Sequence, residues 1–142
     1  MKMHKEYVVT QDQMGMVAAD ILQLSGVRII TLMGSLGAGK TTFVQALLRQ
    51  LGITEPIASP TYTYVNLYKT VAGNIIYHFD LYRLTKQDDF IQAGFDEYLY
   101  QENAWCLIEW PEVIEGLLPD EGCCRIQIEY IDDKTRKISM WS

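Results

Sequence analysis

The stretch VRIITLMGSLGAGKTTFVQALLRQL, residues 27–51, predicts the centre of the fold. Its first part, residues 27–33, is rich in apolar and β-branched side chains, which is typical of a strand buried on both faces of a sheet. Three glycines follow within six residues, and residues 41–51 then space their apolar side chains along one face of a helix until Gly52 ends it. The stretch therefore predicts a strand, a tight loop and a helix, a combination on which mixed α/β folds are built.

The loop in this stretch, GSLGAGKT at residues 34–41, matches the pattern G-x-x-x-x-G-K-[ST]. Glycines let the backbone adopt conformations closed to other residues, so that successive N–H groups point at an anion beside the start of the helix. We expect Lys40 to place its ammonium at the β- and γ-phosphates of a nucleoside triphosphate and the Thr41 hydroxyl to ligate Mg²⁺. The residues predicted to bind the triphosphate are Gly34, Ser35, Leu36, Gly37, Ala38, Gly39, Lys40, Thr41 and Thr42. A glycine-rich turn without a ligand is the alternative.

A carboxylate at the end of a neighbouring strand usually completes the Mg²⁺ site of such a loop. Residues 104–109, AWCLIE, form an apolar run that ends in Glu109. Because ligands bind at the carboxyl ends of parallel strands, we expect Glu109 to lie beside the loop and to be the second metal residue after Thr41. A solvated carboxylate at a strand end is the alternative.

The segment YHFDLYR, residues 77–83, carries two more candidates, Asp80 and Arg83. Asp80 could orient an attacking water molecule or hold the metal ion through its hydration shell. Arg83 is a candidate for the arginine that stabilises charge during phosphoryl transfer. An exposed ion pair between the two, of little energetic value, explains the same residues equally well.

The segment SPTY, residues 59–62, stands where many phosphate-loop proteins have a loop that changes order with the nucleotide state. Hydroxyl groups there could contact Mg²⁺ or the γ-phosphate. An ordinary proline turn before a strand would have the same composition. The residues of this predicted nucleotide-responsive loop are Ser59, Pro60, Thr61 and Tyr62.

The rest of the chain predicts the remaining elements of a sheet flanked by helices. A capping box at Thr10 and Gln13 predicts the start of a helix that ends near residue 25. Turn residues 72–74 between two aromatic and β-branched runs predict an antiparallel hairpin. The predicted strands are 5–9, 27–33, 62–68, 74–82, 105–109, 123–131 and 134–142, and further helical segments are predicted at 86–101, interrupted by Gly94, and at 111–117.

Together these elements predict one α/β domain over residues 1–142, with a P-loop NTPase-like mixed sheet. The hairpin and the two C-terminal strands, which meet at residues 132–133, are expected to be its antiparallel parts. The three cysteines have no metal-site spacing and lie in predicted strands, so we expect buried, reduced thiols at Cys106, Cys123 and Cys124.

The net charge of −6, from 12 basic and 18 acidic residues, argues against a broad nucleic-acid-binding face, which needs clustered Lys and Arg. Any role on nucleic acid is therefore expected to run through a partner. No apolar run approaches the length of a membrane span, and residues 1–12 lack the apolar stretch of a secretory signal. We expect a cytoplasmic protein that does not bind membranes.

In order along the chain, GSLGAGKTT, SPTYTYVNLY, YHFDLYR and LIEWPE together resemble one bacterial family, the TsaE ATPases needed to make threonylcarbamoyladenosine in tRNA. The resemblance runs from about residue 7 to the C-terminal strands. It implies a small cytoplasmic ATPase that joins two sugar-kinase-like partner proteins. Those partners modify the adenosine beside the anticodon, so the ATPase is expected to contact tRNA only indirectly. Its ATP hydrolysis is expected to drive or reset the complex.

The resemblance also implies roles for single residues. Lys40, Asp80 and Glu109 are the expected catalytic residues, with Mg²⁺ as cofactor and ATP as substrate. Thr61 and Tyr62 become part of a nucleotide-responsive loop, and Trp110 becomes a functional neighbour of Glu109.

Two other functions use a similar loop. A small-molecule kinase should carry an arginine-rich lid, but residues 84–103 contain no arginine. A non-enzymatic or guanine-nucleotide switch should read guanine through Asn-Lys-x-Asp, which the chain lacks; the sequence at residues 66–69 is NLYK. Slow hydrolysis without partners is expected for the ATPase, because the sequence shows no arginine finger apart from the candidate Arg83.

Overall fold

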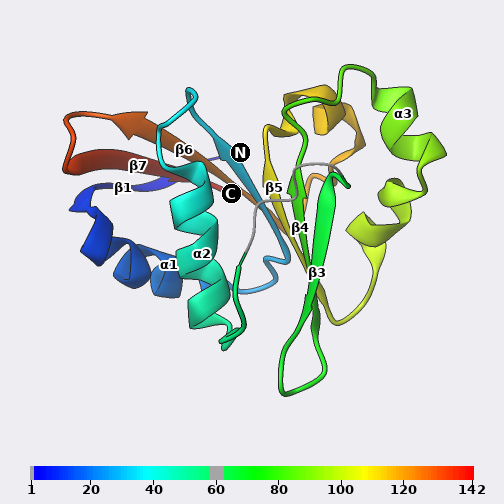
Figure 1. The fold of residues 1–142 in the computed structure, drawn as a ribbon, viewed down its shortest axis with the longest axis horizontal. Coiled ribbons are helices and arrows are strands. Elements are labelled where there is room, and N and C mark those ends of the chain that lie inside the picture. Colours follow the sequence, from blue (N-terminus) through cyan, green and yellow to red (C-terminus); the bar gives the residue numbers. More distant parts are fainter. Residues whose placement is uncertain (1, 58–62) are drawn as a thin grey trace.

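The computed structural model describes residues 2–57 and 63–142, and within them seven strands form one sheet. The strands are β1 (Met3–Thr10), β2 (Ile29–Met33), β3 (Val65–Lys69), β4 (Ile75–Asp80), β5 (Ala104–Glu109), β6 (Cys123–Tyr130) and β7 (Thr135–Trp141). They lie in the order β1-β7-β6-β2-β5-β4-β3, so the two ends of the described chain meet along one edge (Figure 1).

The centre of the sheet is parallel and its margins are antiparallel. β6, β2, β5 and β4 run in one direction, whereas β3 pairs antiparallel with β4, β7 with β6 and β1 with β7. Every residue of β5 is buried, as expected for a strand covered on both faces. The predicted hairpin is β3–β4 and the predicted C-terminal pair is β6–β7, so the predicted mixed α/β fold is confirmed.

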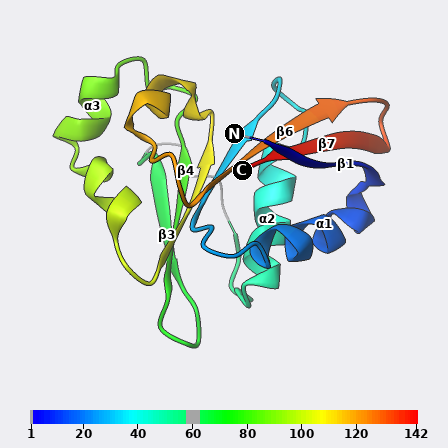
Figure 2. The same cartoon turned by 180° about the vertical axis from the view of Figure 1, so that it is seen from behind.

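Helices cover both faces of the sheet. On one face α1 (Met14–Leu22) and α2 (Lys40–Gln50) lie side by side over the half that contains β1, β7, β6 and β2 (Figure 1). On the other face, α3 (Gln87–Gln92) and the 3₁₀ segments η2 (Phe95–Tyr100) and η3 (Pro111–Leu117) cover β4 and β5 (Figure 2). The short 3₁₀ turn η1 (Gln11–Gln13) leads into α1.

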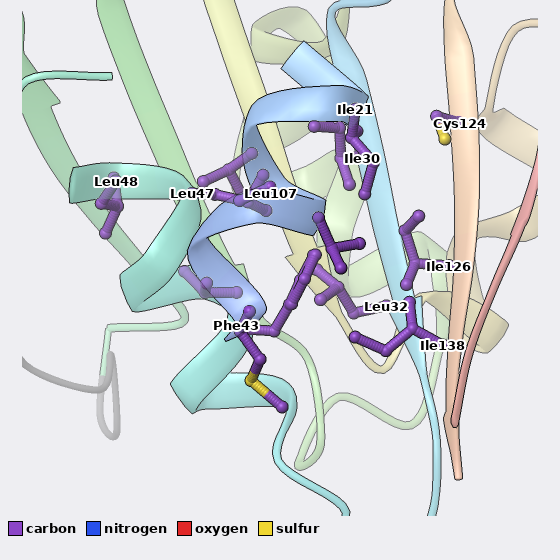
Figure 3. Packing of buried hydrophobic residues seen from close by; sticks show 14 of the residues in the cluster. Ile21, Ile30, Leu32, Phe43, Leu47, Leu48, Leu107, Cys124, Ile126 and Ile138 are labelled. Atoms are coloured by element: carbon purple, nitrogen blue, oxygen red, sulfur yellow. The ribbon is translucent and has the colours of Figure 1, made fainter. Parts of the chain in front are cut away.

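Alternation along the strands divides the core into two layers. In β2, Ile30 and Leu32 face α1 and α2, whereas Ile29 faces α3 and the 3₁₀ segments. Figure 3 shows the first layer, in which side chains of α1 and α2 meet those of the strands. The same alternation decides which polar side chains at the strand ends share a face.

The structure corrects the sequence prediction in several places. The predicted interruption of the helical segment 86–101 at Gly94 is confirmed, since Gly94 has a φ of 80° between α3 and η2, but the second part is a 3₁₀ helix. The predicted helix at 111–117 is a 3₁₀ helix. The predicted strands 62–68 and 74–82 are shorter: Tyr64 has a φ of 63°, and after Asp80 the chain turns away from the sheet.

Two further predictions concern the cysteines and the helix start. Cys106, Cys123 and Cys124 are buried, free thiols in strands, as expected. The capping box is present: the Gln13 side-chain carbonyl accepts the Thr10 N–H at 2.9 Å, although the first turn that it caps is 3₁₀.

None of the helices in residues 2–57 and 63–142 combines the length and the apolar character that crossing a membrane requires.

Candidate functional site

The glycine-rich loop, residues 34–39, connects β2 to α2 at the carboxyl edge of the parallel strands. A Cβ added to Gly34 would lie 2.5 Å from the carbonyl oxygen of Ile128, so no larger residue fits without a shift of backbone. Gly39 caps α2 with a φ of 107°, which L side chains rarely adopt. The close turn therefore depends on glycine at both positions, and it aims the start of α2 at the space in front of the loop.

Lys40, the first residue of α2, is 5% exposed although it carries a charge. Its Nζ donates hydrogen bonds to the carbonyl oxygens of Gly34 at 2.6 Å and Ser35 at 2.8 Å. It also lies 3.9 Å from the centroid of the Trp110 ring. Burial lowers the pKa of Lys40 from its ordinary value, and the nearby carboxylates, Glu109 foremost, partly offset that effect.

Glu109 ends β5 directly beside β2, paired in register with Leu32, and is 2% exposed. Its Oε1 accepts a hydrogen bond of 2.8 Å from the Thr41 hydroxyl. Its Oε2 lies 2.6 Å from Nε2 of His78, which is fully buried. The predicted pair Thr41 and Glu109 is therefore in direct contact, with a histidine on the far side of the carboxylate.

Asp80 pairs in register with Glu109 across β4 and β5, so its side chain lies on the same face as those of Glu109 and His78. Its Oδ1 accepts a hydrogen bond from the Tyr82 N–H at 3.1 Å. The Tyr82 ring lies 4.8 Å from that of Trp110, between centroids. Residues that are 28 and 29 positions apart in the chain thus meet at one edge of the sheet.

These groups line a cavity of about 310 Å³, within the usual range for small-molecule sites. Its lining residues are Leu36, Gly37, Gly39, Lys40, Thr41, Thr42, Asp80, Tyr82, Glu109 and Trp110. Gly34, Ser35 and Ala38 build the loop from behind, through the Lys40 bonds and the bond from the Ala38 N–H to the Ser35 carbonyl. Most of the predicted site therefore converges on one hollow.

Two parts of the predicted site stand apart from this hollow. Arg83 lines a different cavity, together with Tyr64, Asp89 and Phe95. The predicted nucleotide-responsive loop, Ser59, Pro60, Thr61 and Tyr62, lies outside the described residues.

The sequence did not lead us to predict three further residues of the site. His78 and Tyr82 flank Asp80 in the YHFDLYR motif, and the two-residue alternation of the strand was a usable signal for His78. Arg136 of β7 donates from Nε to the Ala38 carbonyl at 2.7 Å, and no local pattern announces that contact. Arg136 also lines a smaller cavity, beside Gln11 and Met14, that shares Gly39 and Thr42 with the larger one.

The oxygen donors of Thr41 and Glu109 are of the kind that Mg²⁺ prefers. Over residues 2–57 and 63–142, three or more His, Cys, Asp or Glu side chains nowhere gather in an arrangement that could hold a metal ion. A cation at Thr41 and Glu109 would therefore need further oxygen ligands from a bound molecule or from water, which fits an ion that arrives with phosphates.

The sequence has extensive similarity to known proteins. The family model described as "Threonylcarbamoyl adenosine biosynthesis protein TsaE" matches residues 8–138. The chain belongs to the TsaE family. That assignment confirms the resemblance expected from the motifs, and the matched residues include the whole cavity described above.

Relatives named tRNA threonylcarbamoyladenosine biosynthesis protein TsaE come from several bacteria. The Haemophilus influenzae protein is 43% identical over 74% of this chain and 65% of its own length, slightly under two thirds. The Aquifex aeolicus protein is 37% identical over 99% of this chain and 98% of its own. The crystal structure of Bacillus subtilis YdiB superposes with a TM-score of 0.76 at 30% identity, over 99% of this chain and 86% of that one. The TsaE fold of this chain is thus shared along its length.

Proposed function

We propose that this protein binds ATP with Mg²⁺ in the glycine-rich loop and hydrolyses it in support of tRNA threonylcarbamoyladenosine biosynthesis. The observation that carries the proposal is the convergence of Lys40, Thr41 and Glu109 in one cavity at the ends of adjacent strands. In phosphate-loop proteins a lysine contacts the phosphates, and a hydroxyl and a carboxylate hold the metal ion. The names of the TsaE relatives supply the biological process.

The loop can receive phosphate by exchanging its internal hydrogen bonds. The Lys40 ammonium donates to two loop carbonyls, and it would exchange these acceptors for β- and γ-phosphate oxygens. The first N–H groups of α2 have no acceptor within the helix, so they add donors and a positive dipole end. The start of α2 is set by the fold before the ligand arrives, and the Lys40 ammonium changes its partners when the phosphates bind.

Thr41 and Glu109 are the residues that would hold Mg²⁺. Once bound, the ion supplies electrostatic stabilisation of the charge that spreads over the transferred phosphoryl oxygens. Asp80, in register with Glu109 and lining the same cavity, is the side chain suited to orient the water molecule. Attack of that water forms a new P–O bond on the γ-phosphorus, breaks the bond to the ADP oxygen and yields ADP and inorganic phosphate.

Hydrolysis by the isolated protein should be slow. Among the described residues, none of those that line the cavity around Lys40, Thr41 and Glu109 is an arginine, and Arg83 lines a separate cavity. An arginine supplied in cis or in trans accelerates phosphoryl transfer by several orders of magnitude. We therefore propose that partner proteins, the two sugar-kinase-like proteins of the tRNA-modifying complex, complete the site. In this proposal the protein contacts tRNA only through its partners and acts in the cytoplasm.

The nucleoside would lie beside Gly39 and Thr42, the two residues that both cavities share. The smaller cavity is lined there by Gln11 and Met14, which belong to the segment just before and at the start of α1. In this proposal the apolar side chain of Met14 and the amide of Gln11 would contact the base.

A binding and hydrolysis assay on matched variants tests the proposal. Thr41→Val removes the hydroxyl at nearly constant shape, whereas Thr41→Ser keeps it. We expect Thr41→Val to lose ATP hydrolysis by at least about tenfold, as loss of a metal ligand should, and Thr41→Ser to retain most of it. Release of phosphate and ADP is measured with Mg²⁺ and with EDTA. Equal activity of the two variants, or transfer of the labelled phosphoryl group to a metabolite, would contradict the proposal.

The coupling to partners has its own experiment. The tagged protein is used to capture proteins from the cytoplasm of its source with Mg-ATP and, separately, with Mg-ADP. We expect two sugar-kinase-like proteins to be recovered in amounts that differ between the nucleotides. Their absence with both nucleotides would contradict the partner role while leaving the ATPase assay unaffected.

A further inference from the structure

His78 on β4 is a fully buried histidine whose polar contact is with Glu109. The distance from His78 Nε2 to Glu109 Oε2 is 2.6 Å, and Glu109 is itself 2% exposed. Burying a polar pair away from water is costly unless the geometry of its hydrogen bond is good. The pair therefore needs an explanation beyond the packing of an apolar layer.

The other polar atoms around this pair define the direction of the contact. Glu109 Oε1 is held from the opposite side by the Thr41 hydroxyl at 2.8 Å. Nδ1 of His78 is buried and has no hydrogen-bond partner among the described residues. A proton on Nε2 leaves no buried N–H group unsatisfied, so the imidazole serves as an N–H donor to the carboxylate. Both oxygens of Glu109 are then fixed by separate donors.

The sheet explains why the carboxylate needs this second donor. Register with Leu32 fixes the backbone of Glu109, but the side-chain torsions remain free to rotate. A donor at Oε2 restricts that rotation and keeps Oε1 directed at Thr41. In metal sites, partners of this kind orient the ligating group, and their loss typically costs 10- to 100-fold in affinity.

We propose that His78 is a positioning residue that holds the Glu109 carboxylate in the orientation needed for a metal ion at Thr41. This inference rests on the proposed function, because it concerns the Mg²⁺ site of that proposal. His78 acts through Glu109 and contacts no ligand itself. It is not one of the residues that line the cavity and lies behind Glu109.

The first test measures how nucleotide binding depends on Mg²⁺. His78→Leu removes the donor and keeps a buried side chain of similar size. We expect the Mg²⁺ concentration for half-maximal binding of a fluorescent ATP analogue to rise about 10- to 100-fold. Binding of the same analogue in EDTA should stay within about twofold of the unsubstituted protein, because the Lys40 contacts are untouched.

A pair of amides separates positioning from packing. The amide nitrogen of glutamine reaches about as far as Nε2 of histidine, whereas that of asparagine reaches only about as far as Nδ1. We therefore expect His78→Gln to restore the Mg²⁺ dependence and His78→Asn to leave it impaired. Thr31→Val is the control, since Thr31 Oγ1 is also buried without a partner among the described residues but faces the other layer. Circular dichroism checks that each variant is folded, and the amide pair decides the matter if the leucine variant is not.

The outcomes distinguish the two proposals. Mg²⁺-dependent binding in the unsubstituted protein together with unchanged Mg²⁺ dependence in His78→Asn would overturn the positioning role alone. Binding that ignores Mg²⁺ in the unsubstituted protein would overturn both proposals. Equal impairment of the glutamine and asparagine variants would assign His78 to packing and also overturn the inference.

Discussion

At the scale of single residues, the most unusual group is the Lys40 ammonium, a charged group that is almost fully buried and lies over the face of the Trp110 ring. Trp110 presents its ring to this ammonium at 3.9 Å with a backbone φ of 57°, a conformation uncommon for a residue other than glycine. A hydrogen bond of 3.3 Å from the Trp110 N–H to the Leu32 carbonyl fixes that backbone, and Pro111 follows. Strain of this kind persists where the surrounding structure enforces it, often at functional sites.

The Lys40–Trp110 contact makes a fluorescence prediction. Bound phosphates should draw the ammonium away from the ring and so change the emission of Trp110. We expect ATP or ADP to change the tryptophan fluorescence of the protein and Trp110→Phe to abolish most of that change. Trp141→Phe, at the end of β7, is the matched control and should leave it intact. A signal that survives in Trp110→Phe would contradict the contact as its source.

The site residues that could be predicted from the sequence are those marked by a pattern of neighbouring residues. Lys40 and Thr41 follow from the spacing of the loop, and Glu109 follows from its place after an apolar run. His78 and Arg136 contribute through contacts made across strands, with Glu109 and with the Ala38 carbonyl. Such contacts depend on which strands become neighbours, and a single sequence does not state that order.

At the scale of elements, the centres were predictable and the ends were not. β5 and α2 stand within one residue of their expected bounds, because an apolar run and a helical period are strong local signals. The region after Asp80 is different: the Tyr82 N–H bonds to the Asp80 side chain and the Leu84 N–H bonds to the Leu81 carbonyl, and this turn ends β4 earlier than its composition suggests.

Two glycines in different elements should respond to alanine in opposite ways. Gly15 lies in α1, where an added Cβ would meet Gln50 Nε2 at an ordinary 3.5 Å, so Gly15→Ala should raise the free energy of unfolding by about 0.5–1 kcal/mol. At Gly34 the Cβ would lie 2.5 Å from the Ile128 carbonyl oxygen, so Gly34→Ala should lower it by about 1–3 kcal/mol and weaken nucleotide binding. Urea unfolding followed by circular dichroism measures both, and a Gly34→Ala variant as stable as the unsubstituted protein would contradict the close approach.

At the scale of the whole molecule, buried weak acids tie stability to pH. Burial raises the pKa of the Cys106 and Cys124 thiols to about 12 from an ordinary value of 9.0. Burial and the hydrogen bond to Asp20 raise the pKa of Tyr7 to about 12 from 10.0. These groups hold their protons in the folded chain over a range of pH in which the unfolded chain has released them.

The free energy of unfolding should therefore fall as the pH rises above about 9. In that range the unfolded state binds fewer protons than the folded state, so stability decreases with pH, and below it the stabilisation is complete. Each group contributes a slope of up to about 1.4 kcal/mol per pH unit. Urea unfolding between pH 8 and pH 10.5, with a reductant present, measures the slope. Cys124→Ala should make it shallower, and a stability independent of pH over this range would contradict the burial of these groups.

The pairing of the first strand with the last also has a consequence in time. β1 pairs with β7, and residues 11–134 lie between them, so β1 has no partner strand until β7 has been synthesised. At roughly 5–20 residues per second, the wait on the ribosome is on the order of ten seconds. β7 also brings Arg136 to the Ala38 carbonyl, so the glycine-rich loop acquires this support at the same moment. We expect a nascent chain to acquire its nucleotide-binding loop in final form only after β7 has emerged, when its first strand is the last to join the sheet.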